Sequence, residues 1–212
     1  MNIIRIVKKG KADVTIQLDN DKNLILAVEV FLKSGLKKGT EISDDRFLYL
    51  VEQNKIFHIK QRAFRLLGRR QHSSSELKRK LWNKDYDRKL IEEVITELES
   101  KAYIDDEEFI KAFILEKSQT RNWSVNRLKS ELIKRGISQK QIDLALSEQP
   151  KQFEKESALK LANKKYQQLL NRNLETKELR NKISTFLFSK GFNYELIKEV
   201  CDSIINIDSE EF

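Results

Sequence analysis

A spaced pattern of apolar residues that recurs three times constrains the fold of this chain more than any other feature. Counting from Leu77, from Leu128 and from Ile183, apolar or aromatic residues follow at offsets of 4, 9, 14 and 17 residues. The offset of 8 is occupied in turn by Asp85, Gly136 and Gly191. Apolar residues four apart form the stripe of one helix, and a residue that tolerates the left-handed conformation ends it. The pattern therefore predicts a helical unit repeated in tandem.

Helix starts recur in register with this pattern. The residues two positions after offset 8 all favour N-caps, and they are Asp87, Ser138 and Asn193. Capping-box patterns occur at Ser73–Glu76, at Ser138–Gln141 and, with Asp in place of Ser or Thr, at Asp105–Glu108. A further helix precedes each pair, over about residues 53–70, 106–120 and 152–170. We expect three tandem three-helix repeats that bury their apolar faces by stacking into an elongated, curved array.

The first 28 residues differ from the rest of the chain because their apolar residues alternate. Val14, Ile16 and Leu18 have polar neighbours, residues 19–22 carry a turn signal, and residues 24–28 resume an apolar run. This region predicts two or three strands with a hairpin. We therefore expect a mainly α protein with a small N-terminal β appendage. The expected domains are residues 1–49, with the strands and a short helix, and repeats over residues 50–104, 105–149 and 150–212.

The composition agrees with a helical chain. The 212 residues include six Gly and one Pro, which is typical of helix-rich proteins and not of all-β proteins. Cys201 has no partner for an internal disulfide, and neither a charged-then-apolar leader nor a long apolar run is present. We therefore expect a cytoplasmic protein that does not enter a membrane.

Residues that could carry catalysis are not grouped in the patterns that catalysis needs. The chain has no Gly-rich phosphate loop, no Cys/His metal-ligand spacing and only two histidines. The adjacent acids Asp105 and Asp106 could resemble a metal site, but an N-cap followed by a first-turn acid explains them more simply. We therefore expect no enzymatic activity, no cofactor and no metal.

Positive charge is concentrated in one segment. The chain has 41 Lys and Arg against 33 Asp and Glu, a net charge of +8, and residues 54–84 hold ten basic residues but a single acid, Glu76. On the helix expected here, four cations lie within about 80° of one another: Lys55, Arg62, Arg65 and Arg69. A solvated helix face would ordinarily interleave acids four residues away. The segment therefore favours a surface for a polyanion or an acidic partner.

Other cations extend the set of predicted contacts. The full set of candidates for contact with DNA or a partner protein is Lys55, Arg62, Arg65, Arg69, Arg70, Lys78, Arg79, Lys80, Arg121, Arg127, Lys134 and Arg135. Such side chains neutralise phosphates, which gives an affinity that depends on salt and not on base sequence. Trp82 and Trp123 are expected to pack across repeat interfaces, although an exposed ring beside Arg121 could stack on a base.

Three segments resemble the RecX family of recombination regulators. They are residues 69–81 (RRQHSSSELKRKL), 103–113 (YIDDEEFIKAF) and 123–137 (WSVNRLKSELIKRGI). The resemblance is good over residues 50–150, whereas the third repeat agrees mainly in its apolar frame. Two positions depart from the family pattern, because Ala102 and Ser124 stand where glycines are usual. Alanine is unfavourable if the backbone is left-handed there, while serine can cap a helix instead.

The resemblance also implies a function. A protein of this family is expected to bind the RecA recombinase in the groove of its filament on single-stranded DNA, and to inhibit strand exchange, ATP hydrolysis and co-protease activity. That role belongs to homologous recombination, DNA repair and the SOS response. We expect a monomer, with double-stranded DNA as a further candidate ligand. Groove blocking and filament disassembly both stay open as mechanisms. The alternative is a general basic DNA-binding repeat protein without a recombinase partner.

Overall fold

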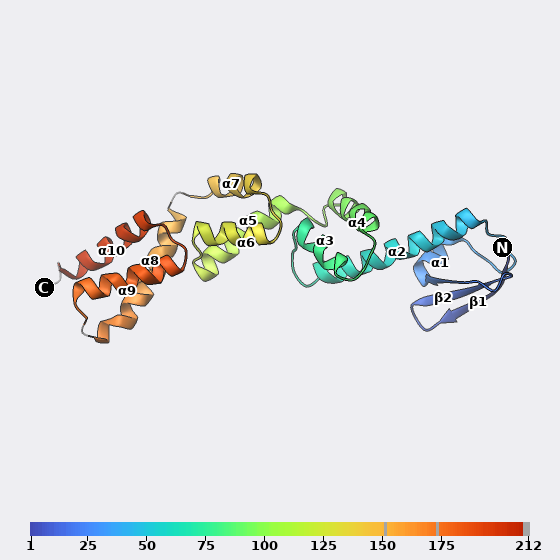
Figure 1. The fold of residues 1–212 in the computed structure, drawn as a ribbon, viewed down its shortest axis with the longest axis horizontal. Helices are drawn as coiled ribbons and strands as arrows, with labels where there is room; N and C mark the ends of the chain where they lie inside the picture. The colour runs from blue at the N-terminus through green and yellow to red at the C-terminus, as the bar shows by residue number, and fades with distance from the viewer. Residues whose placement is uncertain (151, 173, 210–212) are drawn as a thin grey trace. The chain divides into compact units, whose positions relative to one another are not determined.

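The computed structural model describes residues 1–150, 152–172 and 174–209, and the chain divides into two compact units, residues 1–104 and 105–212 (Figure 1). The described chain is mainly helical, with one small antiparallel sheet near the N-terminus. This confirms the fold class that the sequence predicts. No described helix combines the length and the apolar character that crossing a membrane requires.

The sheet forms because alternate residues of its strands are apolar. Strands β1 (Ile3–Lys9), β2 (Asp13–Leu18) and β3 (Asn23–Ala27) pair antiparallel in that order. In this register Ile6 is opposite Ile16, and Ile16 is opposite Leu24. The buried face packs against helix α1 (Val28–Ser34) and the first half of α2 (Asp44–Leu67). The sequence left two or three strands open, and the structure has three in the region that it describes.

Helix α2 is shared by the sheet region and the first repeat. It begins behind the N-cap Ser43, and position 49/50, which separates the first two expected domains, lies inside it. Leu50 packs with the sheet residues, whereas Ile59 and Ala63 pack with α3 (Ser74–Trp82) and α4 (Arg88–Ser100). The second half of α2 is therefore the first helix of the first repeat.

Two further three-helix repeats make up the second unit. The second repeat consists of α5 (Asp106–Arg121), α6 (Val125–Lys134) and α7 (Gln139–Ser147). The third consists of α8 (Phe153–Leu169), the short 3₁₀ helix η1 (Leu170–Arg172), α9 (Thr176–Ser189) and α10 (Tyr194–Ser209). Each repeat buries its own apolar cluster, which contains Leu128 and Leu132 in the second repeat and Ile183, Leu187 and Cys201 in the third.

The helix ends follow the predicted pattern. The residues at offset 8 are all left-handed, with φ of 59° at Asp85, 79° at Gly136 and 87° at Gly191. The predicted N-caps are confirmed as well: Asp87 accepts from Leu90 N–H, Ser138 forms a complete capping box with Gln141, and Asn193 accepts from Leu196 N–H. The repeat pattern therefore sets both the cores and the boundaries of the helices.

Asp105 and the two departures from the family pattern have clear local roles. Asp105 accepts from Glu107 N–H and Glu108 N–H, each at 2.9 Å, so it is the N-cap of α5. In the part of the chain that the structure describes, no three His, Cys, Asp or Glu side chains are grouped as metal ligands. Ala102 has φ of 55°, a left-handed conformation that costs a non-glycine residue about 1 kcal/mol. Ser124 caps α6 by accepting from Arg127 N–H (3.3 Å).

Candidate nucleic-acid and partner interface

Three of the four cations predicted on one helix face lie on α2, whereas Arg69 lies in the turn after the last helical residue, Leu67. Lys55, Arg65 and Arg69 are exposed and Arg62 is half-buried, and among the described residues none of the four makes an ion pair. We call these four residues the α2 ridge. The buried Arg62 Nε has no hydrogen-bond partner in the described structure. The ridge therefore presents charge that other side chains of its own unit leave uncompensated.

His58 lies on the same stripe of α2 and was not among the sequence candidates. It is exposed, and its ring meets the Phe57 ring edge-on with 5.7 Å between centroids. At about 100° per residue, position 58 lies within the same 80° arc of the helix surface as Lys55, Arg62 and Arg65. The helical period alone could have placed it in the ridge, and an imidazole there adds a hydrogen-bonding group to a row of cations.

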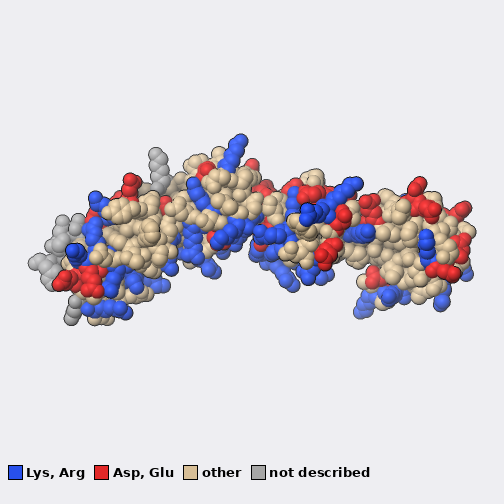
Figure 2. All heavy atoms as spheres, in the orientation of Figure 1, with Lys and Arg blue, Asp and Glu red and all other residues tan. Residues whose placement is uncertain are grey.

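Several other cations of the basic segment are paired. Lys78 Nζ lies 2.6 Å from Glu92 Oε2, and Lys60 Nζ lies 2.5 Å from Glu97 Oε2. Both acids belong to α4, so the local excess of positive charge in the sequence is reduced when the helices pack. Arg79 is exposed on α3. Figure 2 shows Lys and Arg side chains gathered where α2 ends and α3 begins.

A buried charged cluster fixes the turn between α2 and α3. Glu76, with 6 % of its surface exposed, pairs with the Arg70 guanidinium through both carboxylate oxygens and lies 3.4 Å from Lys80 Nζ. His72, 4 % exposed, contacts Arg70 O through Nδ1 (2.9 Å) and Lys80 Nζ through Nε2 (2.8 Å). Arg70 and Lys80, predicted as ligand contacts, are therefore also structural residues of this turn.

The cluster lowers the pKa of two of its members, Glu76 and His72. Burial by itself raises the pKa of the Glu76 carboxyl, but the hydrogen bond and charge of Arg70, with the charges of His72 and Lys80, outweigh burial and lower that pKa to about 2. Burial lowers the pKa of His72, and the charges of Arg70 and Lys80 lower it further against the hydrogen bond to Arg70 O. Glu76 is therefore ionised over the physiological range, and the turn that carries Arg69 is held by its charge.

The four candidates in the second unit lie at the two ends of α6 and at the end of α5. Arg121 is exposed, and the Arg127 guanidinium lies over the Trp123 ring at 4.4 Å. Lys134 Nζ lies 2.9 Å from Glu131 Oε1, and Arg135 pairs with the same carboxylate at 2.8 Å. The cations at the start of α6 are thus available for an external ligand, whereas those at its end share Glu131.

The two tryptophans differ in exposure. Trp123 packs on Phe113 with 6.0 Å between ring centroids and is partly buried in the core of the second repeat, as expected. Trp82 is 48 % exposed, and the Arg88 guanidinium lies 3.4 Å from the centre of its ring. Trp82 is the last residue of α3 and lies outside the core of its own repeat, so its packing across a repeat interface stays a prediction.

Comparisons with known proteins agree with this architecture. Models of the first, second and third three-helix domains of RecX match residues 60–98, 105–146 and 154–201. "Regulatory protein RecX" of Clostridium beijerinckii is 29% identical over 212 residues, which is 100% of this chain and 99% of the relative. The protein of the same name from Clostridioides difficile is 29% identical over 211 residues, 98% of each chain.

Solved structures show the same fold. A crystal structure of regulatory protein RecX superposes with a TM-score of 0.73 at 23% identity, covering 95% of this chain and 98% of the other. RecX from Lactobacillus salivarius gives a TM-score of 0.65 at 22% identity, covering 71% of this chain and 97% of the other. The relatives are named as regulatory proteins and not as enzymes. With three RecX domains in order and relatives that match over its full length, the chain belongs to the RecX family.

Proposed function

We propose that this chain binds the RecA filament on single-stranded DNA and inhibits its recombinase, ATPase and co-protease activities. Modulation of RecA is the role of the RecX family, and the three domains of that family are present here in order. The observation that carries the proposal is the α2 ridge, where Lys55, Arg62, Arg65 and Arg69 are left without acids by the fold of their own unit. The protein acts by binding, with no chemistry of its own.

The ridge suits the proposed partner physically. From Lys55 to Arg65 it extends along about 15 Å of helix, and Arg69 continues it in the turn after α2, so the ridge is long enough to contact several phosphates or an acidic protein surface. A ligand shifts an equilibrium only by its differential affinity for the two states. The chain therefore inhibits if it prefers a filament conformation that is inactive, or free subunits, over the active filament.

The ATPase rate of the cognate recombinase on single-stranded DNA tests the proposal. We expect inhibition by wild-type protein below one molecule per recombinase subunit. The triple variant Lys55→Glu/Arg65→Glu/Arg69→Glu should need at least about tenfold more protein for the same inhibition, because charge reversal turns steering attraction into repulsion. Arg62 is left unchanged because it is half-buried.

A matched control separates the ridge from net charge. Lys8, Lys9 and Lys11 are exposed in the same unit, on and beside the β1–β2 hairpin, and none makes an ion pair with a described residue. Their triple change to Glu alters the net charge by the same amount and should leave inhibition within about twofold. Equal loss in both triple variants would show a general charge effect and would contradict a ridge contact.

A second candidate function is general binding to DNA without a recombinase. The unpaired cations of the ridge and the exposed Trp82 ring favour it. The same assay discriminates the two: an unchanged ATPase rate, together with retarded migration of naked DNA in the same buffer, would support general DNA binding. Filaments assembled on labelled DNA distinguish the two mechanisms of inhibition. Filament disassembly releases the DNA from the recombinase, whereas groove blocking does not.

The state and setting of the protein complete the proposal. We propose a monomer that acts in the cytoplasm, in homologous recombination, DNA repair and the SOS response. Sedimentation velocity over a range of concentrations tests the first part, and a single species of 25.1 kDa is expected. A species of twice that mass at the concentrations of the ATPase assay would contradict the monomer, and each particle would then carry two ridges.

A further inference from the structure

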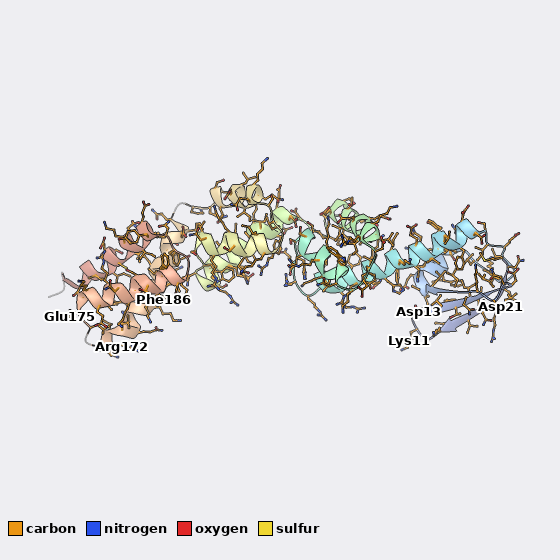
Figure 3. The ribbon with its side chains drawn as sticks, in the orientation of Figure 1. Lys11, Asp13, Asp21, Arg172, Glu175 and Phe186 are labelled. Atoms are coloured by element: carbon orange, nitrogen blue, oxygen red, sulfur yellow. The ribbon has the colours of Figure 1, made fainter. Side chains whose placement is uncertain are left out.

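A groove in the third repeat combines features that neither the ridge nor the repeat pattern explains. It has a volume of about 520 Å³ and lies between the end of α8 with η1 and one face of α9. Its lining residues are Lys165, Leu169, Arg172, Glu178, Asn181, Lys182, Thr185, Phe186 and Ser189. Figure 3 labels Arg172 at the turn between α8 and α9 and Phe186 on α9, and Figure 2 shows Lys and Arg over the same side of this repeat.

The charge of the groove is positive, and part of it is uncompensated. Glu178 Oε1 lies 3.1 Å from Lys182 Nζ, so these two neutralise each other. Lys165 and Arg172 make no ion pair with any described residue. Two free cations on one wall and a neutral pair on the other leave a site for anions such as phosphates.

An aromatic ring lies among these cations. Phe186 is partly buried, with Lys165 Nζ 5.5 Å and Lys190 Nζ 5.1 Å from the centre of its ring. Asn181 and Thr185 stand one helical turn apart on the same face of α9 and add an amide and a hydroxyl to the wall. A base can stack on such a ring while the lysines turn to its phosphates, and the polar side chains can meet base edges.

We propose that this groove binds one unpaired strand of nucleic acid, with a base stacked on Phe186 and phosphates held by Lys165 and Arg172. The α9 wall extends for about 16 Å from Glu178 to Ser189, the length of a few nucleotides. A duplex does not fit this chemistry, because its bases are already stacked on one another and present no free face. The site is separate from the α2 ridge and requires no recombinase.

Fluorescence anisotropy of a labelled oligothymidylate of about twenty nucleotides tests the proposal with the full chain. The ridge variant Lys55→Glu/Arg65→Glu/Arg69→Glu is the background, so that the ridge does not contribute to the measured affinity. Phe186→Leu keeps an apolar side chain but removes the stacking face, and it should weaken binding about tenfold. Lys165→Gln/Arg172→Gln should weaken it about tenfold or more and lower the slope of log affinity against log salt by about 1.4.

The matched control is Lys177→Gln/Lys198→Gln. Both lysines are exposed on the third repeat, outside the groove and without ion pairs to described residues, so binding should stay within about twofold of the background. Equal losses from the groove and control pairs would overturn the proposal in favour of diffuse attraction. Competition by inorganic polyphosphate or polyglutamate as strong as that by oligothymidylate would overturn it too, as would equal affinity for duplex. An oligouridylate of the same length distinguishes an RNA ligand from a DNA ligand.

A cross-linking measurement tests the same site without relying on the folding of Phe186→Leu. Ultraviolet irradiation of an oligonucleotide that carries 5-iodouracil should join it to the tryptic peptide of residues 183–190, which contains Phe186. The cross-link should disappear in Lys165→Gln/Arg172→Gln, whose changes lie on the surface of the repeat. Cross-links that map only to other repeats would overturn the assignment of the groove.

Discussion

The start of α3 in the first repeat and the start of α6 in the second are the same backbone with different side-chain chemistry. Ser73 and Ser124 are both fully buried N-caps with φ of -69° and ψ of 156° and 159°. Each hydroxyl accepts from the N–H three residues on, at 3.1 Å from Glu76 N and 3.3 Å from Arg127 N. The charge at this third position is negative in one repeat and positive in the other.

The difference shows which part of the repeat is free to vary. The Glu76 carboxylate is buried and pairs with Arg70 and Lys80, whereas Arg127 is exposed and its guanidinium lies over the Trp123 ring. The serine cap and the apolar residues after it determine the helix, so the side chain at the third position can either stabilise the turn or face a ligand. The first repeat uses this position for stability, and the second leaves it available.

The largest expected difference is between Glu76→Ala and Arg127→Ala. Removing Glu76 leaves the half-exposed Arg70 and its neighbours without their anion, and it should lower the free energy of unfolding by about 3 kcal/mol. Arg127→Ala should cost less than about 1 kcal/mol, because only an exposed cation–π contact is lost. Urea unfolding measures both, with Trp82 fluorescence in a Trp123→Phe background for the first repeat and Trp123 fluorescence in Trp82→Phe for the second. Equal losses would mean that the two sites are energetically alike.

The sequence predicts the helix ends and caps that the repeats share, but it does not predict which charged side chains pair after folding. The offset-8 residues and caps are local signals, so Asp85 and Ser138 could be assigned from neighbours within one or two helical turns. The acids that pair with Lys60 and Lys78 lie on α4, and their proximity depends on tertiary packing that no local pattern contains. The cations of the α2 ridge stay without ion pairs to described residues after this packing, because no acid of α4 pairs with them.

The third-repeat groove could not be predicted for a related reason. Its residues come from α8, η1 and α9, and no pattern in the sequence indicates that these three segments meet. Phe186 is one position before the core residue Leu187, so the sequence alone does not distinguish it from the core. Lys190 is four residues further along and so is a local neighbour, but only the packing of α9 on α8 brings Lys165 to the Phe186 ring.

Acid should act on the two helix starts with opposite sign. The pKa of Glu76 is lowered from 4.5 to about 2, so its stabilisation is complete above about pH 4.5 and is lost as the pH falls toward 2, by up to about 3 kcal/mol. At the start of α6, Glu154 Oε1 accepts from Val125 N–H (2.8 Å). Burial raises the pKa of Glu154, against that hydrogen bond and the charge of Lys129, so its ionisation destabilises the fold as the pH rises past 4.5.

Gln variants make this contrast measurable. The stability advantage of wild type over Glu76→Gln should shrink as the pH is lowered from 4.5 to 2. Glu154→Gln should become more stable relative to wild type as the pH is raised through and above 4.5. Unfolding of each repeat, followed through its own tryptophan, gives both differences. A parallel dependence on pH for the two variants would contradict the environments described here.

A smaller effect is expected at the cap of α6 itself. Ser124→Ala should cost about 2 kcal/mol, because Ser124 Oγ also donates to Lys190 O (2.9 Å) and so joins the second repeat to the third. Ser124→Gly restores the residue usual in the family and should recover most of the cap contribution but not this bond. If Ser124→Gly is as stable as wild type, the bond to Lys190 contributes nothing.

The smallest effect on stability should have the clearest functional meaning. Arg127→Gln and Arg88→Gln each remove a guanidinium from a tryptophan ring, at 4.4 Å from Trp123 and 3.4 Å from Trp82, and each should cost at most about 1 kcal/mol. Both variants should therefore be folded at the temperature of an ATPase assay. If Arg127→Gln weakens inhibition of the recombinase and Arg88→Gln does not, the exposed cation at the start of α6 contacts the partner. A different outcome would be that neither variant changes inhibition and that Arg127→Gln lowers the free energy of unfolding by more than Ser124→Ala does. Position 127 would then stabilise the second repeat as Glu76 stabilises the first, and the two helix starts would differ only in the sign of that charge.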